Sequence, residues 1–168
     1  MKKPLLIIIA CLFLQSCWLH RNDERGDINP VTSSFEPLTI DREIFESTIA
    51  IGAPREIEEA GKIYVNGDIV FINELNKGFH VLDNHDPKNP ANILFIEIPL
   101  ATDLAIRNNT IYVHHAVDLV AMRLDANSIE ILHRVRNVFP RLNSPDGFLA
   151  EDFDLGENQI IIGYQSLN

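Results

Sequence analysis

Residues 61–100 read GKIYVNGDIVFINELNKGFHVLDNHDPKNPANILFIEIPL, and this stretch decides the predicted architecture. Its four short apolar runs are rich in β-branched and aromatic residues, which favour strands. Turn-forming residues separate the runs at Asn66-Gly67-Asp68, at Asn76-Lys77-Gly78 and in the proline-rich segment 84–90. Asn-Gly is the pair that a two-residue hairpin turn prefers, because both central residues take positive φ. We therefore predict four antiparallel strands that follow one another as a meander.

The same pattern recurs in residues 101–138, about 40 residues further along the chain. There Asn108-Asn109 corresponds to Gly67-Asp68, and the run Ile111-Tyr112-Val113 corresponds to Val70-Phe71-Ile72. A four-stranded unit with this period is typical of a β-propeller blade. A plain antiparallel sheet with evenly spaced strands is the alternative. The predicted fold class is all-β: a partial β-propeller of two four-stranded antiparallel blades, 61–100 and 101–138, plus an extra C-terminal strand.

Residues 1–16 have the composition of an export signal. Lys2 and Lys3 precede an apolar run at 5–14, which is shorter than the roughly 20 residues that a membrane-spanning helix needs. The run ends in Leu14-Gln15-Ser16-Cys17, which resembles the lipobox of bacterial lipoproteins. This resemblance implies that Cys17 carries fatty acyl chains such as palmitate and becomes the N-terminus after cleavage. An ordinary secretory signal cleaved near Ser16 is the alternative.

The cysteine count agrees with this interpretation. The chain has two cysteines, and Cys11 lies within the apolar run. After cleavage Cys17 alone remains, so the rest of the chain has no thiol for a disulfide, a thiolate metal site or a nucleophile. Several acyl chains give stable membrane attachment where one gives only marginal binding. We therefore expect the lipid bilayer as a partner, through acylated Cys17.

The remaining segments are assigned from composition. Residues 17–36 are polar and lack periodicity, which predicts a flexible tether. Residues 37–60 form a lead-in to the first blade, with Asp41 placed to cap a short helix. Residues 139–168 are predicted to hold a long loop and then one strand, the start of an incomplete third blade.

Several short motifs carry a resemblance to a known family. They are Gly61-Lys62-Ile63-Tyr64, Lys77-Gly78, Asp86-Pro87, Asp118-Leu119-Val120 and Asn137-Val138-Phe139-Pro140. In combination they resemble LVIVD-repeat lipoproteins, which are propeller-like surface or periplasmic lipoproteins of Bacteroidetes-type bacteria. The second copy departs from the family pattern at Met122-Arg123-Leu124. The resemblance implies a propeller-like fold and a location in the cell envelope, at the outer membrane, and it implies no activity.

Two blades are fewer than the roughly four to eight blades of a propeller. They leave sheet edges and one face uncovered. The chain is then either a truncated or split gene product, or a half-propeller that pairs with another copy. The strand at 159–164, followed by no closing strand, favours the fragment.

Charge excludes some partners. The chain has 24 Asp and Glu residues against 14 Lys and Arg residues, a formal net charge of −10. This charge repels nucleic acid and anionic lipid headgroups, so we expect no nucleic-acid partner. The chain also lacks a glycine-rich phosphate-binding loop.

Three polar clusters are candidate sites. His114 and His115 lie beside Asp118, but neighbouring strand residues point to opposite faces, so we predict one histidine inside, one in solvent and no metal ion. The turn with Asp83, His85 and Asp86 suits Asx-turns better than a calcium site. The acidic cluster of Glu151, Asp152 and Asp154 is interpreted as a solvated loop rather than as paired catalytic carboxylates.

Five aromatic residues recur with strand periodicity inside apolar runs. We predict that they pack in the core, rather than form a platform on which sugars stack. They are Tyr64, Phe71, Phe79, Phe95 and Tyr112.

These observations predict a membrane-anchored envelope lipoprotein that serves as a binding or scaffolding module. We expect no catalytic residues, no metal and no cofactor, with a protein or glycan partner or self-association. An accessory hydrolase of envelope glycans that uses acidic loop residues, or a truncated non-functional remnant, is the alternative. The candidate ligand-facing residues lie where the two copies differ and in the loop after Pro140; they are His114, His115, Asp152 and Asp154.

Overall fold

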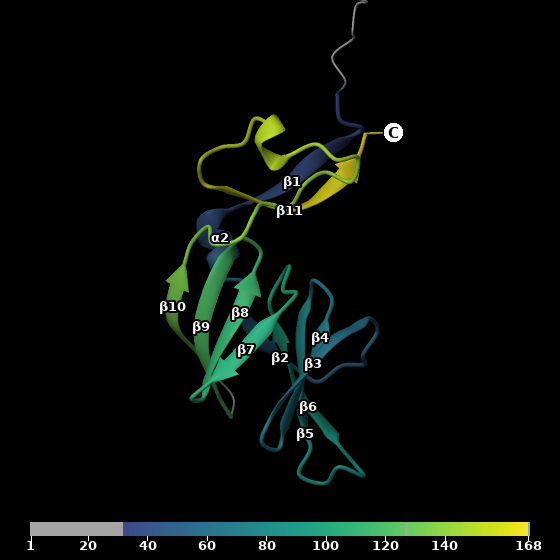
Figure 1. Cartoon of the computed structure of the whole chain (residues 1–168), viewed down its shortest axis with the longest axis vertical. Coiled ribbons are helices and arrows are strands. Elements are labelled where there is room, and N and C mark those ends of the chain that lie inside the picture. Colours follow the sequence, from purple (N-terminus) through teal and green to yellow (C-terminus); the bar gives the residue numbers. More distant parts are fainter. Residues whose placement is uncertain (1–31, 127, 168) are drawn as a thin grey trace, which may run out of the picture. The chain divides into compact units, whose positions relative to one another are not determined.

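The computed structural model describes residues 32–126 and 128–167 (Figure 1). These residues are all-β, which confirms the predicted class at that level. They form eleven strands in three antiparallel sheets, none of which closes on itself. Within the same residues, no helix is both long and apolar enough to cross a membrane.

The first sheet contains the predicted meander of residues 61–100. Four consecutive strands pair antiparallel in chain order, and a short strand from the lead-in pairs with the last of them, so the order is β2-β6-β5-β4-β3. The strands are β2 (Ala50–Gly52), β3 (Ala60–Asn66), β4 (Ile69–Glu74), β5 (Gly78–Asp83) and β6 (Ala91–Glu97).

The second sheet repeats the meander in the order β10-β9-β8-β7. Its strands are β7 (Leu104–Arg107), β8 (Thr110–His115), β9 (Asp118–Asp125) and β10 (Ser128–Val135). The two sheets approach each other where β3 lies beside β7 and where β2 lies beside β10.

The third sheet joins the two ends of the described chain (Figure 1). Strand β1 (Phe35–Asp41) pairs antiparallel with β11 (Gln159–Ser166). Helix α2 (Arg42–Glu46) follows β1 and contacts both strands, and a 3₁₀ turn, η2 (Ala150–Asp152), lies in the connection to β11. The predicted short helix after Asp41 is present, but the Asp41 side chain makes no capping hydrogen bond.

The pairing of β1 with β11 changes the predicted boundary between the tether and the folded domain. Phe35 and Glu36 belong to a strand rather than to a flexible tether, because they pair with Ser166 and Gln165. The lead-in of residues 37–60 is likewise more ordered than its composition suggests, since it supplies β1, α2 and β2. The first part of the predicted tether, residues 17–31, lies outside the described residues.

The first hairpin turn also differs in register from the prediction. Asn66 pairs with Ile69, so the two central residues are Gly67 and Asp68 rather than Asn66 and Gly67. Gly67 alone has positive φ, at 61°, which matches the hairpin type that needs glycine first. The predicted geometry with two positive φ values occurs instead in the second copy, at Asn108 and Asn109, with φ of 48° and 60°.

One buried cluster draws on both large sheets and forms the main core. It includes Phe71, Phe79 and Val81 from the first sheet, and Val113 and Met122 from the second. The aromatic prediction is confirmed for Phe71 and Phe79. Phe95 is also buried, but it lies outside this cluster, against His80 and Arg55. Tyr64 is half-buried against the cluster, whereas the Tyr112 side chain is 38% exposed. A second cluster of Phe45, Ala116, Val117 and Ile160 joins α2, the β8–β9 turn and β11.

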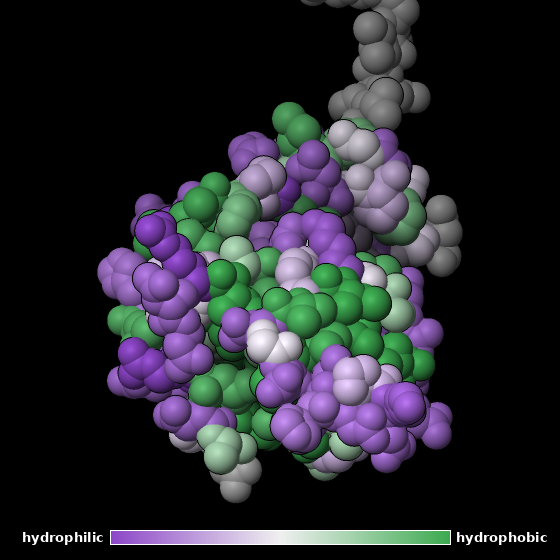
Figure 2. Space-filling view, turned by 60° about the horizontal axis from the view of Figure 1, so that its bottom comes forward, coloured by the Kyte–Doolittle hydropathy of each residue, from purple (hydrophilic) through white to green (hydrophobic). Residues whose placement is uncertain are grey.

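Apolar side chains also reach the surface. Figure 2 shows a broad apolar area, in green, bordered by hydrophilic side chains. The largest exposed fractions of big apolar side chains within the described residues are those of Val65 and Ile63 on β3. Uncovered apolar surface of this kind commonly marks an interaction site.

Gly78 carries the first testable prediction. Its φ is +140°, and an added Cβ would lie 1.9 Å from the Ile96 carbonyl oxygen on the neighbouring strand. Gly78→Ala is therefore expected to lower the free energy of unfolding by about 3 kcal/mol or more, measured by urea denaturation. Gly67→Ala is the matched control: its φ is +61° with no atom within 4 Å of the added Cβ, so it should cost only about 1–2 kcal/mol. Equal costs for the two substitutions would contradict the close approach at Gly78.

Candidate functional site

Each large sheet holds one buried carboxylate at the same corner of its meander. In the first sheet Glu74, the last residue of β4, pairs with Gly78 at the start of β5. In the second sheet His115, the last residue of β8, pairs with Asp118 at the start of β9. Glu74, His115 and Asp118 are all essentially inaccessible to solvent. Buried ionisable groups are costly unless they are fully paired, so their partners decide what these corners do.

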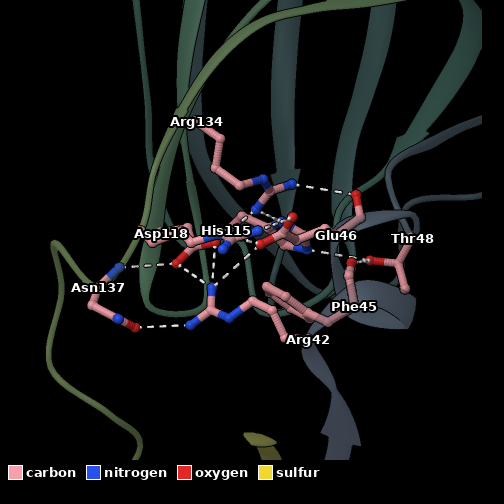
Figure 3. Close-up of polar contacts among 9 residues, drawn as sticks. Arg42, Phe45, Glu46, Thr48, His115, Asp118, Arg134 and Asn137 are labelled. Atoms are coloured by element: carbon pink, nitrogen blue, oxygen red, sulfur yellow. Dashed lines mark hydrogen bonds and ion pairs between the residues drawn. The ribbon is translucent and has the colours of Figure 1, made fainter. Parts of the chain in front are cut away.

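Asp118 is held by two arginines and a backbone group (Figure 3). The Arg42 guanidinium of α2 donates to both carboxylate oxygens, at 2.9 and 2.8 Å, and Arg134 of β10 donates to Oδ2 at 2.9 Å. The backbone N–H of Asn137 donates to Oδ1 at 3.0 Å. Burial raises the pKa of Asp118, but these donors outweigh it and hold the pKa below its usual range. The carboxylate is therefore ionised and joins three segments distant in sequence.

His115 lies next to this ion cluster as a neutral ring. It stacks on Phe45 of α2 with the ring centroids 3.9 Å apart. Arg134 can only donate, so Nδ1 of His115 accepts its N–H at 3.1 Å, and Nε2 donates to Thr48 Oγ1 at 3.2 Å. Burial, and then the positive charge of Arg134, lower the pKa of His115 to about 3. Both ring nitrogens of His115 thus have hydrogen-bond partners inside the protein.

Glu74 plays the corresponding part in the first sheet. Its carboxylate accepts hydrogen bonds from the backbone N–H groups of Glu59, at 2.7 Å, and Glu58, at 3.2 Å. It also accepts a hydrogen bond from Nε2 of the buried His80, at 3.0 Å. Burial raises the pKa of Glu74, but the hydrogen bonds from His80 and the two backbone groups hold it below its usual range. Glu74 thereby fastens the segment before β3 to the sheet. Both corners serve to hold the lead-in segments in place.

A groove of about 510 Å³ opens on the face of the second sheet that points away from the core. Its lining includes Tyr112 and His114 of β8, Leu119 of β9, and Phe139 and Pro140 of the following segment. Tyr112 and His114 face this side because the intervening Val113 points into the core. The groove is mostly apolar and aromatic, which is the usual character of ligand sites.

The polar groups of the groove lie at one end. Thr102 Oγ1 is 3.2 Å from Nδ1 of His114, and the His114 ring meets Phe139 edge-on with centroids 4.6 Å apart. Burial lowers the pKa of His114. Asp103 pairs with Lys62 and accepts the hydroxyl of Tyr64, both on β3, and these contacts lower the pKa of Asp103. This end of the groove therefore adjoins the contact between β3 and β7.

Of the four candidate ligand-facing residues, His114 lines the groove and the other three do not. His114 and His115 end strand β8 rather than lying in a loop, and His115 is fully buried, so it presents no surface to a ligand. The prediction of one histidine inside is confirmed by His115, whereas His114 faces outward but is half-buried against Phe139 rather than free in solvent. The Asp152 carboxylate accepts the Leu149 backbone N–H at 2.8 Å and caps η2. Asp154 is exposed in the segment that follows.

The remaining predicted positions are placed as follows. Asp83 accepts the backbone N–H of His85 at 2.9 Å, and Asp86 accepts that of Lys88 at 3.1 Å, which are the expected Asx-turn contacts. Among residues 32–126 and 128–167, no group of three His, Cys, Asp or Glu side chains is arranged to hold a metal ion. Cys17, the predicted lipidation site, lies outside the described residues.

Sequence reasoning missed most of the buried polar network. The sequence places Asp118 in a family motif and beside two histidines, but nothing local in it marks Arg42, Arg134 or His80 as partners of buried carboxylates. The available signal was an ionisable residue at the end of an apolar strand run, as at Glu74. Such a residue is informative because charged side chains are seldom fully buried unless they are paired.

Comparisons of the chain with protein-family models, with curated proteins and with solved structures return no match. The resemblance to LVIVD-repeat lipoproteins therefore stays a prediction.

His115 makes the stability of the protein depend on pH. Its pKa is about 3 in the folded state and about 6.5 in the unfolded chain. As pH falls below about 6.5 the unfolded chain binds a proton that the folded protein does not, so stability present above that pH is lost. The unfolding equilibrium constant should rise by up to about tenfold per pH unit in this range.

His115→Gln should remove this effect. The variant is expected to be less stable at pH 7 but to lose stability less steeply between about pH 6.5 and about pH 4.5, as measured by urea denaturation at several pH values. His114→Gln is the control, because His114 is only half-buried and should change the slope less. A slope in His115→Gln equal to that of the unmodified protein would contradict the neutral buried ring.

Proposed function

We propose that this protein is a lipid-anchored binding module of a bacterial cell envelope, attached to the outer membrane through acylated Cys17. The basic start, the short apolar run and the lipobox-like Leu14-Gln15-Ser16-Cys17 support the anchor. Two or more acyl chains would give the stable attachment that one chain cannot.

The groove on the outer face of the second sheet carries the proposed binding role. It offers recessed aromatic and apolar surface at Tyr112, His114 and Phe139, together with the polar groups of Thr102 and Asp103 at one end. A volume of about 510 Å³ suits a small ligand or a side chain of a partner. An envelope protein or glycan is the proposed class of partner.

We also propose that the two meanders are propeller-like blades, as the resemblance to LVIVD-repeat lipoproteins suggests. Both have their strands in chain order, and their first strands, β3 and β7, lie beside each other. A shared apolar cluster between the sheets supports the same arrangement. In such a fold the outer face of the second sheet is the place for the next blade or for a partner.

Binding is favoured over the alternative of glycan hydrolysis by the roles of the carboxylates. Asp152 is occupied in capping η2. Asp118 and Glu74 are buried and saturated with donors that hold the lead-in segments. General acid–base catalysis requires a carboxyl within reach of a substrate proton, which the buried Asp118 and Glu74 do not offer.

The anchor is tested by Cys17→Ser in the full-length chain. The substitution should abolish labelling by radioactive palmitate and move the protein from the membrane fraction to the soluble fraction of a bacterial host. Cys11→Ser should leave both properties unchanged, because Cys11 belongs to the cleaved segment. Retained labelling in Cys17→Ser would contradict the lipobox interpretation.

The groove is tested by site-specific photocrosslinking in cells. A benzophenone amino acid in place of Tyr112 should capture an envelope component at several times the yield of the same group in place of Leu149. Leu149 is a suitable control because its side chain is 52% exposed and lies outside the groove. Equal capture at the two positions would contradict a specific role for the groove.

A further inference from the structure

Strand β3 presents the most exposed large apolar side chains of the described residues. The Ile63 side chain is 63% exposed and that of Val65 is 68% exposed. Strand β3 is also an edge of the first sheet, since it pairs with β4 on one side and is last in the strand order. Edge strands offer unpaired backbone groups to other chains.

The register of the hairpin shows which backbone groups face the open edge. Asn66 pairs with Ile69 across a two-residue loop, so this closing pair exchanges backbone hydrogen bonds. Antiparallel pairs alternate, and Tyr64 with Phe71 is therefore the next hydrogen-bonded pair. Ile63 and Val65 direct their N–H and C=O groups away from β4. The two residues with the most exposed apolar side chains thus also carry the open backbone donors and acceptors.

The apolar surface continues across the outer face of the sheet. Val65 lies beside Val70, which in turn pairs with Leu82, and Ile63 lies beside Ile72. Val70, Ile72 and Leu82 are only half-buried. By contrast, the β6 side of this face is covered where Arg55 lies over the Phe95 ring, 3.4 Å from its centroid. The open part of the face is therefore the part that adjoins the β3 edge.

Natural edge strands are usually protected by charge, proline or a bulge. The segment Ile63-Tyr64-Val65 contains no charge and no proline. The register shift between β3 and β4 lies before this segment, between Ala60 and Ile63, and from Ile63 to Asn66 the pairing is continuous. The nearest charge, on Lys62, is paired with Asp103. An unprotected apolar edge of this kind is either an aggregation hazard or an interface.

We propose that β3 pairs antiparallel with β3 of a second copy of this chain, which makes the protein a two-fold dimer. In the matching register Ile63 lies opposite the partner's Val65, and Val65 lies opposite the partner's Ile63. These two pairs provide about four backbone hydrogen bonds. Tyr64 then lies opposite the partner's Tyr64 at the centre of the interface.

A second copy suits this edge for two reasons. The register places Lys62 opposite the partner's Asn66, so no two like charges face each other across the strands. The arrangement is also isologous, because each copy contributes the same strand to the interface. Assembly therefore stops at two copies. Pairing therefore uses up the open edge without creating another one.

The mass of the full-length protein in detergent tests the proposal. Sedimentation equilibrium in density-matched detergent should give twice the mass of one chain. Val65→Lys places a charge on the paired edge and should reduce the mass to that of one chain at the same concentration. Leu149→Lys is the control, because Leu149 is also largely exposed, and it should stay a dimer. Thermal unfolding followed by circular dichroism checks that both variants are folded.

Disulfide formation gives a second readout that does not depend on a destabilising charge. Hydrogen-bonded antiparallel partners have Cα atoms about 5.5 Å apart, within the range that a disulfide bridges. Co-purified copies with Ile63→Cys and Val65→Cys should therefore oxidise to a cross-linked dimer, whereas copies with Ile63→Cys alone should cross-link much less.

Three outcomes would overturn the proposal. They are a single-chain mass for the unmodified protein at every concentration, a folded Val65→Lys variant that remains a dimer, and equal cross-linking in the mixed and unmixed cysteine samples. A monomeric protein would leave the edge to an extended segment of another protein.

Discussion

The buried carboxylate of Asp118 is the contact on which the junction between the second and third sheets depends. It receives Arg42 from α2, Arg134 from β10 and the backbone N–H of Asn137. Helix α2 in turn contacts β1 and β11, so this one charge ties the third sheet to the second. Loss of one partner from a buried ion pair costs about 3–5 kcal/mol, because the remaining charge stays buried without compensation. The neutral His115 ring stacks on Phe45 of α2 and so adds a contact between α2 and the second sheet.

Glu74 shows the same solution in the other meander. Both carboxylates lie at the corner where the second strand turns into the third, and both fasten a segment that precedes the sheets in sequence. The ligands differ, since Glu74 takes two backbone N–H groups and His80 while Asp118 takes two arginines. The carboxylates occupy the two sides of the same corner, since Glu74 ends β4 whereas Asp118 begins β9. Each holds a different segment, and neither is exposed as a reactive group.

The accessible features of the domain lie on the surfaces that the two sheets turn away from each other. The second sheet offers the groove between Tyr112, His114 and Phe139, and the first sheet offers the apolar edge of β3. Both surfaces follow from having two meanders packed on one core, because each sheet then has one face without a neighbouring sheet. A binding module with a partner in the groove and a second copy at the β3 edge would have both surfaces covered. The recessed, aromatic character of the groove and the uncharged segment Ile63-Tyr64-Val65 at the edge suit these different occupants.

The sequence by itself determined the all-β class, the two meanders, their turns to within one residue, and the opposite facing of His114 and His115. These are local properties, set by alternation of apolar residues and by the positive φ that Asn and Gly tolerate. Only the tertiary structure decided that β1 pairs with β11, that Asp118 collects Arg42 and Arg134, and that Tyr112 stays on the surface while Phe79 is buried. These outcomes join residues far apart in the chain, and no local pattern specifies which distant strand or charge will supply the missing partner.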